Sequence, residues 1–389
     1  MTTFRSRVDE RGTVELLGRL VEIDSVNPSL VPGAAGEKKI AEFLDQYMQS
    51  LGLETDLEEV APGRFNVVGI LKGTGGGRTL MLNGHTDTVG ADYMDIDPFD
   101  PVVKEGRMYG RGTYDMKGGL ASLLGAMKAV VESGAELKGN VIVAAVCDEE
   151  FASIGTERVV EGYRADAAIV GEPTELQIEI AHKGFAWIDI MTEGFAAHGS
   201  AWELGVDAIA KMGKVQVGLE RHQEEALMKK AHELVGPPSV HSSIIEGGRE
   251  LSTYPDRCSL QVERRLIPGE TRSDVEEEFT GLLESISADD PNFKGSYEIT
   301  FFRGPMEVPR EEAICQILRD GSREVTGTEP AFIGGGGWLD TQIIWESGTP
   351  AVAFGPRGYG AHGAVEYVEI DSVIEASKVV ERAIHLFCG

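Results

Sequence analysis

Two patterns of hydrophobic and polar residues alternate along the chain, and the first combines short apolar runs with helical periodicity. The apolar runs are "FNVVGIL", "TLMLNGH", "NVIVAAVCDEE" and "AAIVGEP". Residues 13–52 and the stretch "GGLASLLGAMKAVVESG" repeat apolar residues at helical spacing instead. Apolar strands that alternate with helices predict an α/β domain with a mixed, mostly parallel sheet flanked by helices. Ligands of such sheets lie beyond the carboxyl ends of the strands.

The second pattern, at residues 184–302, is typical of half-exposed strands. The runs "FAWIDIMTEG", "SVHSSIIEGG", "RCSLQVERRLIP" and "SYEITFF" alternate apolar and polar residues, and two helical stretches lie between them. The order β-α-β-β-α-β predicts an inserted two-layer α+β domain of ferredoxin-like type. We therefore expect one domain from residues 1–183 and 303–389, and a second from residues 184–302.

Composition excludes several classes of partner. Among 389 residues, 36 Lys and Arg face 64 Asp and Glu, which gives a net charge of −28. A surface this acidic argues against binding nucleic acid or anionic lipid. No apolar run approaches the ~18 residues that cross a bilayer, and the first residues contain no apolar signal region. Four scattered cysteines predict reduced thiols rather than a disulfide framework. We expect a cytoplasmic enzyme that contacts no membrane.

Acidic and histidine residues gather where the predicted strands end. Taken alone, each is more often a helix cap or a solvated loop residue. Three consecutive acids in "DEE" are harder to explain in this way, because their mutual repulsion must be compensated by a cation or by protons. The candidates are His85, Asp87, Asp115, Asp148, Glu149, Glu150, Glu172 and His362.

The residue types indicate a catalytic metal site. Imidazole and carboxylate donors without thiolates suit Zn²⁺ or a related divalent ion. Two histidines and three carboxylates exceed what one ion needs and suit two ions about 3.5–4 Å apart. In this interpretation His85 is a ligand, and Asp87 orients its ring.

The ordered motifs "GHTDTV", "YGRGTYDMKGG", "DEE", "GEPT" and "AHGAVEYV" resemble those of the M20 metallopeptidases and amidohydrolases. Acetylornithine deacetylase, succinyl-diaminopimelate desuccinylase and carboxypeptidase G2 belong to this family. The resemblance extends from about residue 23 to the C-terminus. It implies that His85 and Glu172 hold one ion, that Glu150 and His362 hold the other, and that Asp115 bridges them. It makes Glu149 the general base, with Asp87 orienting His85 and Asp148 in a structural role.

The inserted segment resembles the lid and dimerisation domain of the same family. The resemblance implies that His198, in "AAHGSAWELGVDAI", stabilises the oxyanion and that Arg265, in "PDRCSLQVERRLIPGE", binds a substrate carboxylate. It also implies a homodimer through this domain. Trp202, Ser252 and Trp338 depart from the commoner pattern, so the two tryptophans either line a substrate pocket or pack internally.

We expect a dinuclear amidohydrolase, with Zn²⁺ or alternatively Co²⁺ or Mn²⁺, that removes the acyl group from an N-acyl amino acid. Two alternatives remain open from the sequence. A dipeptidase or carboxypeptidase would use the same centre on a different substrate, and a non-catalytic metal-binding protein would keep the ligands without turnover. The presence of Glu149 argues against the second alternative, because a binding site needs no base beside its ligands.

Overall fold

The computed structural model describes residues 4–389, and the chain forms two compact units. The first unit contains the residues up to Ile180 together with Val308–Ile333 and Leu339–Gly389. The second contains Ala181–Glu307 and Gly334–Trp338. The chain passes between the two units within a few residues of the expected domain boundaries. The short segment Gly334–Trp338 is different, because it was expected in the first domain and groups with the second unit.

The main sheet has the strand order β1-β2-β6-β3-β7-β15-β8-β13, and β14 pairs with β8. The four central strands β6, β3, β7 and β15 run parallel, whereas β1, β2, β8 and β13 add antiparallel neighbours. The α/β class is thus confirmed, with a parallel block of four strands at the centre of the sheet. The strands are β1 Glu54–Ala61, β2 Arg64–Leu71, β3 Leu80–His85, β6 Val141–Val146, β7 Ala167–Val170, β8 Ile178–His182, β13 Met306–Glu307, β14 Phe332–Gly335 and β15 Ala351–Ala353.

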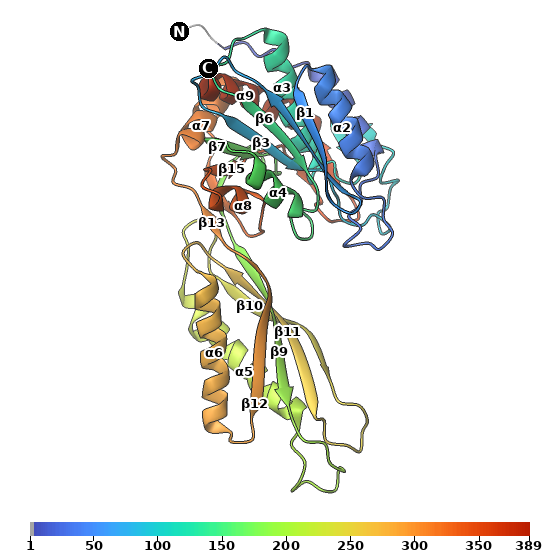
Figure 1. The fold of residues 1–389 in the computed structure, drawn as a ribbon, viewed down its shortest axis with the longest axis vertical. Helices are drawn as coiled ribbons and strands as arrows, with labels where there is room; N and C mark the ends of the chain where they lie inside the picture. The colour runs from blue at the N-terminus through green and yellow to red at the C-terminus, as the bar shows by residue number, and fades with distance from the viewer. Residues whose placement is uncertain (1–3) are drawn as a thin grey trace. The chain divides into compact units, whose positions relative to one another are not determined.

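Helices cover both faces of this sheet, as the continuous burial of the central strands requires (Figure 1). Helices α3 and α9 pack side by side, with α1 and α7 against them. On the opposite face, Val159 of α4 and Ile344 of α8 join a core with Ile142 and Val170. The helices are α1 Glu10–Glu22, α2 Lys38–Ser50, α3 Lys117–Ser133, α4 Ile154–Gly162, α7 Ala313–Thr326, α8 Thr341–Glu346 and α9 Ile370–Cys388. Residues 13–52 were expected to be helical, but α1 and α2 are separated by a loop.

Helix α3 approaches the end of β7 through a glycine. A Cβ atom at Gly119 would lie 1.6 Å from the carbonyl oxygen of Gly171, the residue directly before Glu172. The absence of a side chain at Gly119 therefore lets the helix pack against the segment that carries a predicted metal ligand.

We expect Gly119→Ala to lower the free energy of unfolding by about 1–3 kcal/mol or more, because neither backbone can move aside cheaply. Chemical denaturation would measure this loss. The matched control is Gly281→Ala in a second-unit helix, where a Cβ meets nothing within 4 Å. That control should be neutral or slightly stabilising, since alanine favours helix. Equal stability of the two variants would contradict the argument.

A small antiparallel sheet brings distant parts of the first unit together. Its order is β16-β17-β5-β4. The strands are β4 Val102–Lys104, β5 Arg107–Tyr109, β16 Gly358–Tyr359 and β17 Tyr367–Glu369. Pairing of β5 with β17 sets the "YGRGTYDMKGG" segment beside the "AHGAVEYV" segment.

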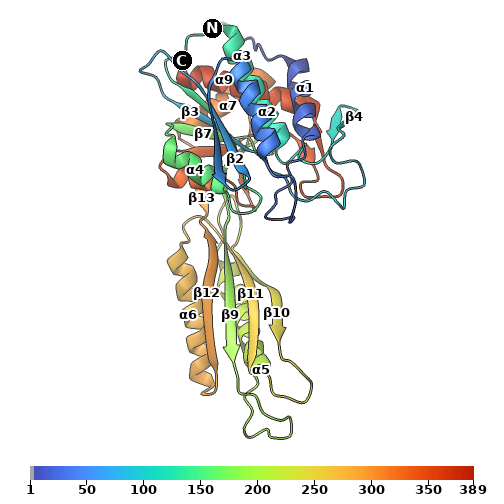
Figure 2. The same cartoon turned by 45° about the vertical axis from the view of Figure 1, so that its right-hand side comes forward.

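The second unit is a two-layer α+β domain, as expected. Its antiparallel sheet has the order β10-β11-β9-β12 (Figure 2). Apolar residues on one face of the sheet form a core with α5 and α6. The elements in chain order are β9 Gly184–Glu193, α5 Ala208–Glu225, a 3₁₀ turn at Leu227–Lys229, β10 Ser239–Gly247, β11 Arg257–Leu266, α6 Arg272–Asp289 and β12 Lys294–Arg303. This order of strands and helices is the ferredoxin-like one.

In the part of the chain that the structure describes, the helices are too short or too polar to cross a membrane.

Candidate metal centre

The predicted ligands follow strands that are neighbours in the sheet. β6, β3 and β7 are adjacent and parallel, so the residues that follow them emerge at one edge. His85 ends β3, Glu149 and Glu150 follow β6, and Glu172 follows β7. Asp115 lies two residues before the start of α3 and is joined to Met116 by a cis peptide bond. His362 comes from the segment between β16 and β17.

The structure gathers these side chains into two groups that share one carboxylate. His85, Asp115 and Glu172 form the first group, and Asp115, Glu150 and His362 form the second. Within each group the potential ligand atoms lie within 4.8 Å of one another. Every predicted ligand therefore belongs to a group in which it can bind an ion.

The two oxygens of Asp115 face opposite groups. Oδ1 lies 3.2 Å from Nε2 of His85, and Oδ2 lies 3.3 Å from Nε2 of His362. His85 Nε2 is also 3.6 Å from Oε1 of Glu172, and His362 Nε2 is 2.9 Å from Oε2 of Glu150. A carboxylate with one oxygen in each group is the geometry that a bridging ligand requires.

The donor set fits divalent ions. Oε1 of Glu150 and Oε1 of Glu172 are buried and have no hydrogen-bond partner within residues 4–389. Unsatisfied buried carboxylate oxygens are costly unless a cation compensates them. Nitrogen and oxygen donors without sulfur suit Zn²⁺, Co²⁺ or Mn²⁺.

Electrostatics support the same interpretation. Burial raises the pKa of Glu172 well above the usual carboxyl value and raises the pKa of Glu150 to about 7. Burial alone would lower the pKa of His85, but Glu172 and Asp115 outweigh it and raise that pKa. Hydrogen bonds to Asp115 and Glu150 raise the pKa of His362 to about 10. Metal ligands bind in their deprotonated form, so ions that bind to this cluster should displace protons from it.

Glu149 lies beside the first group without belonging to it. Its Oε2 is 3.8 Å from Nε2 of His85, and its side chain is 10% exposed. Burial raises its pKa well above the usual carboxyl value. A carboxylate that is close to the ligands and has a raised pKa is suited to accept and return a proton.

Asp87 contacts the centre differently from the expectation. His85 Nδ1 lies 2.9 Å from the backbone oxygen of Asp87 and 3.7 Å from its Oδ1, beyond hydrogen-bond distance. The Asp87 carboxylate instead accepts the backbone N–H groups of Glu149 and Glu150, each at 3.2 Å. The Asp87 carboxylate therefore orients the backbone of Glu149 and Glu150, while the Asp87 main chain orients the His85 ring.

A second set of buried polar residues supports this loop. Asp148 accepts from Arg64 at 2.7 Å and from Asn27 at 3.1 Å, in keeping with a structural role. Asn27 also donates to Asp87 at 2.7 Å, and Arg64 pairs with Glu37. Sequence reasoning missed these partners, because an isolated Asn, Arg or Glu far from the motifs carries no signal.

Arg111 and Glu366 clamp the two segments that carry Asp115 and His362. Both side chains are fully buried or nearly so, and they pair at 2.7 Å. Glu366 also accepts the backbone N–H groups of Gly112, Tyr114 and Asp115 at 2.9–3.1 Å. Arg111 donates to the carbonyl oxygen of Gly363, next to His362, at 3.0 Å. One ion pair therefore holds the backbone at Asp115 close to the backbone next to His362.

We expect Glu366→Gln to weaken metal binding about 10–100-fold, as loss of a residue that orients ligands typically does. The amide would turn an NH₂ group toward donors that now face a carboxylate. Titration calorimetry with Zn²⁺ would measure the change. The matched control is Glu369→Gln, whose 3.2 Å pair with Arg357 is about one-third exposed and contributes little. Equal Zn²⁺ affinity in both variants would contradict the clamp.

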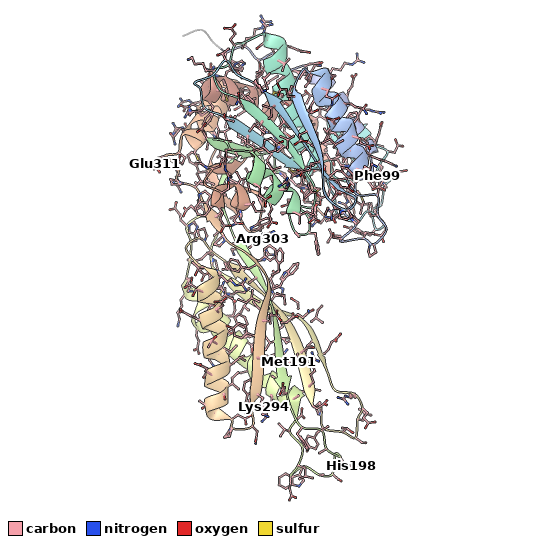
Figure 3. All side chains as sticks on the ribbon, viewed as in Figure 1. Phe99, Met191, His198, Lys294, Arg303 and Glu311 are labelled. Atoms are coloured by element: carbon pink, nitrogen blue, oxygen red, sulfur yellow. The ribbon has the colours of Figure 1, made fainter. Side chains whose placement is uncertain are left out.

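His198 and Arg265 belong to the second unit. His198 lies in the loop beyond the end of β9, and its Nδ1 is 2.8 Å from Oγ of Ser200 (Figure 3). Arg265 is on β11, pairs with Glu263 at 2.7 Å and is 30% exposed, whereas its neighbour Arg264 is fully buried. Of the two adjacent arginines, Arg265 is thus the one that can reach a ligand.

The three positions that depart from the family pattern also lie in the second unit. Trp202 is 70% exposed, so it packs little within this chain. Ser252 accepts the N–H of Gly199 with its backbone oxygen at 2.8 Å. The ring of Trp338 lies 6.3 Å from that of Phe185.

The large mixed sheet, the two-layer α+β unit and the two groups of candidate ligands agree with the class of protein that the motifs indicate. Residues 81–386 match the model of peptidase family M20/M25/M40. The chain belongs to this family, whose members hydrolyse amide bonds.

Relatives and solved structures differ in their activities. The chain is 31% identical to N-formyl-4-amino-5-aminomethyl-2-methylpyrimidine deformylase of Bacillus subtilis (strain 168), over 92% of this chain and 91% of the relative. It is 30% identical to acetylornithine deacetylase of Myxococcus xanthus, over 86% and 87% of the two chains. The fold matches aminopeptidase PepT of Bacillus cereus with a TM-score of 0.80 at 18% identity, over 98% of this chain and 100% of that one.

Proposed function

We propose that the protein is a dinuclear metal-dependent amidohydrolase that removes the acyl group from an N-acyl amino acid. The observation that carries this proposal is the pair of ligand groups that share Asp115, with Glu149 beside them. His85 and Glu172 would hold one ion, and Glu150 and His362 the other. Zn²⁺ is the ion that the nitrogen and oxygen donors suit best, with Co²⁺ and Mn²⁺ as alternatives.

Bound ions would supply Lewis-acid chemistry at the amide carbonyl and lower the pKa of a water molecule. The protein residues supply the proton transfers and the positioning. A carboxylate oxygen of Glu149 accepts the proton of the attacking water and returns it to the leaving nitrogen. Asp87 holds Glu149 and Glu150 in place through their backbone N–H groups.

Two roles in the second unit complete the proposal. His198 stabilises the negative oxygen of the tetrahedral intermediate, and Arg265 binds the substrate carboxylate with a two-pronged contact. The family resemblance of their segments supports both roles, and the exposure of Arg265 beside the buried Arg264 supports the role of Arg265.

The type of acyl group that the protein removes is determined by measuring amine release from a set of substrates. The substrates are N-formyl, N-acetyl, N-succinyl and aromatic N-acyl amino acids, together with plain dipeptides. N-formyl compounds belong in the set because one relative is named a deformylase. Zn²⁺-loaded protein should release amine from N-acyl amino acids, and Glu149→Gln protein serves as the blank. Release from dipeptides alone would make the protein a peptidase, and silence with all substrates would overturn the proposal.

We also propose a homodimer through the second unit. β10 is an edge strand of its sheet, and its Ile244 and Ile245 are 54% and 48% exposed. An edge strand with exposed apolar residues favours pairing with another chain.

We expect a dimer in sedimentation velocity and a monomer after the double substitution Ile244→Lys and Ile245→Lys. The control is Val103→Lys in the first unit, at a residue of similar exposure, 56%. A wild-type monomer, or a double variant that remains dimeric, would exclude this interface.

A cytoplasmic location remains our proposal. All four cysteines are buried free thiols. Fractionation should recover the protein with cytosolic markers, and recovery with extracellular proteins would contradict the proposal.

A further inference from the structure

One face of the second-unit sheet is covered by helices, and the other carries an ordered set of rings and charges. Ala186 and Ile188 of β9 point toward the helices and are fully buried. Because side chains alternate along a strand, Phe185 and Trp187 point to the opposite face. That face is the subject of this inference.

The strand register places six side chains in two rows on this face. In the first row Phe185 pairs with Arg265 on one side and with Arg303 on the other. In the second row Trp187 pairs with Glu263 and with Phe301. Each row therefore has an aromatic ring at its centre.

The rings form one continuous aromatic surface. The centroids of Phe185 and Phe301 are 5.6 Å apart with their planes inclined at 28°, and those of Trp187 and Phe301 are 5.1 Å apart. Trp338 adds its ring 6.3 Å from Phe185. Trp187 is nevertheless 39% exposed. The surface thus has room to stack a further ring.

Positive charges border this aromatic surface. The guanidinium of Arg265 lies 5.2 Å from the ring centre of Phe185, and that of Arg303 lies 5.0 Å from the ring centre of Phe301. Burial lowers the pKa of Lys183, and the neighbouring Arg265 lowers it further. Glu263 lies on the same face and pairs with Arg265 at 2.7 Å, so a ligand carboxylate would bind Arg265 beside Glu263 or in its place.

We propose that this face binds the aromatic side chain and the carboxylate of an N-acyl aromatic amino acid. The proposal rests on the proposed function and names its substrate class. Neighbouring strands lie about 4.8 Å apart. If the ligand carboxylate binds Arg265 on β11, the adjoining part of the ligand therefore lies over Phe185 and Trp187 on β9. Rings stack there, whereas the cationic side chain of ornithine would lie near the guanidinium groups of Arg265 and Arg303 and near a Glu263 carboxylate that already pairs with Arg265.

A purely structural role is the competing explanation, because cross-strand aromatic pairs also stabilise sheets. The two explanations differ in substrate dependence. A structural role changes all substrates alike, whereas a binding role changes aromatic substrates most, mainly through KM.

The test compares kcat and KM for N-acetyl-L-phenylalanine, N-acetyl-L-cyclohexylalanine, N-acetyl-L-alanine and N-acetyl-L-ornithine. Wild-type protein should prefer phenylalanine over its non-aromatic analogue of equal size, and ornithine should be the poorest substrate. In Trp187→Leu combined with Phe301→Leu, kcat/KM for phenylalanine should fall about tenfold through KM, the scale of lost ring contacts. The loss with alanine should be several times smaller.

Trp345→Leu is the matched control, because Trp345 is 40% exposed and lies in the first unit. It should leave the substrate preference unchanged. Single Trp187→Leu and Phe301→Leu variants guard against a double variant that fails to fold. Equal losses with phenylalanine and alanine in any folded variant, or a wild-type preference for ornithine, would overturn the inference.

Direct binding separates this inference from the proposed function. Titration calorimetry with N-acetyl-L-phenylalanine needs neither turnover nor a tryptophan reporter. Binding that is weakened in the double variant supports the aromatic surface even if no N-acyl amino acid is hydrolysed, an outcome that would overturn the proposed function alone. Absence of binding together with absence of aromatic turnover would overturn the inference.

Discussion

Replacing Glu149 by Gln is expected to remove nearly all turnover while both ions remain bound. The amide cannot accept a proton from the attacking water, and general acid-base groups typically contribute about 10²–10⁴-fold in rate. The side chain is of the same size, and Glu149 belongs to neither ligand group, so the centre should keep its shape. The measurement is kcat of Zn²⁺-loaded protein together with metal content by mass spectrometry.

The control for this experiment is Glu161→Gln. Glu161 is 66% exposed and pairs with Arg158 at the surface. Its activity should equal that of the wild type. Normal activity in Glu149→Gln would refute the mechanism. Loss of metal in that variant would mean that Glu149 is a metal ligand rather than a base.

Replacing Asp115 by Ala is expected to abolish tight binding of both ions. Asp115 is the member common to the two groups, with one oxygen directed to each. Loss of a residue that only orients a ligand weakens binding about 10–100-fold, so loss of a shared ligand should exceed that. Dialysis against dilute Zn²⁺ followed by mass spectrometry would count the ions.

Glu172→Ala is the informative comparison, because Glu172 belongs to one group alone. It should lower the Zn²⁺ content to about one ion per chain, whereas Asp115→Ala should lower it to nearly none. Two ions retained in Asp115→Ala would exclude a shared ligand. Identical losses in the two variants would mean that the sites bind their ions cooperatively rather than separately.

Much of the centre could be predicted because its ligands follow buried strands. The run "NVIVAAVC" indicates a central strand, and the acids after it emerge with His85 and Glu172 at one edge of the sheet. Strand ends are local features, so periodicity finds them. His362 lies in a longer segment between β16 and β17, beyond the glycines that follow a predicted strand, and only the family resemblance grouped it with Glu150.

The supporting contacts could not be predicted, because they join distant residues through tertiary packing. Arg111 and Glu366 stand in quoted motifs, yet their pairing depends on the antiparallel contact between β5 and β17. The Asp87 carboxylate does not hydrogen-bond to the His85 ring, because its Oδ1 lies 3.7 Å from Nδ1 of His85. No sequence pattern encodes that distance.

The second unit illustrates the same limit. Alternating residues predicted its strands, and the order of elements predicted its topology. Register determines that Phe185 lies between Arg265 and Arg303, and register follows from turns and core packing. Trp338 was expected among residues of the first domain and instead joins the aromatic surface of the second unit.

The measurement that tests the account most directly is amine release from N-acyl amino acids by Zn²⁺-loaded protein, with metal-depleted protein and Glu149→Gln as blanks. The account predicts turnover that depends on the metal, disappears in Glu149→Gln and is confined to N-acyl amino acids rather than dipeptides. Turnover that persists without metal or in Glu149→Gln, or that is confined to dipeptides, would contradict it.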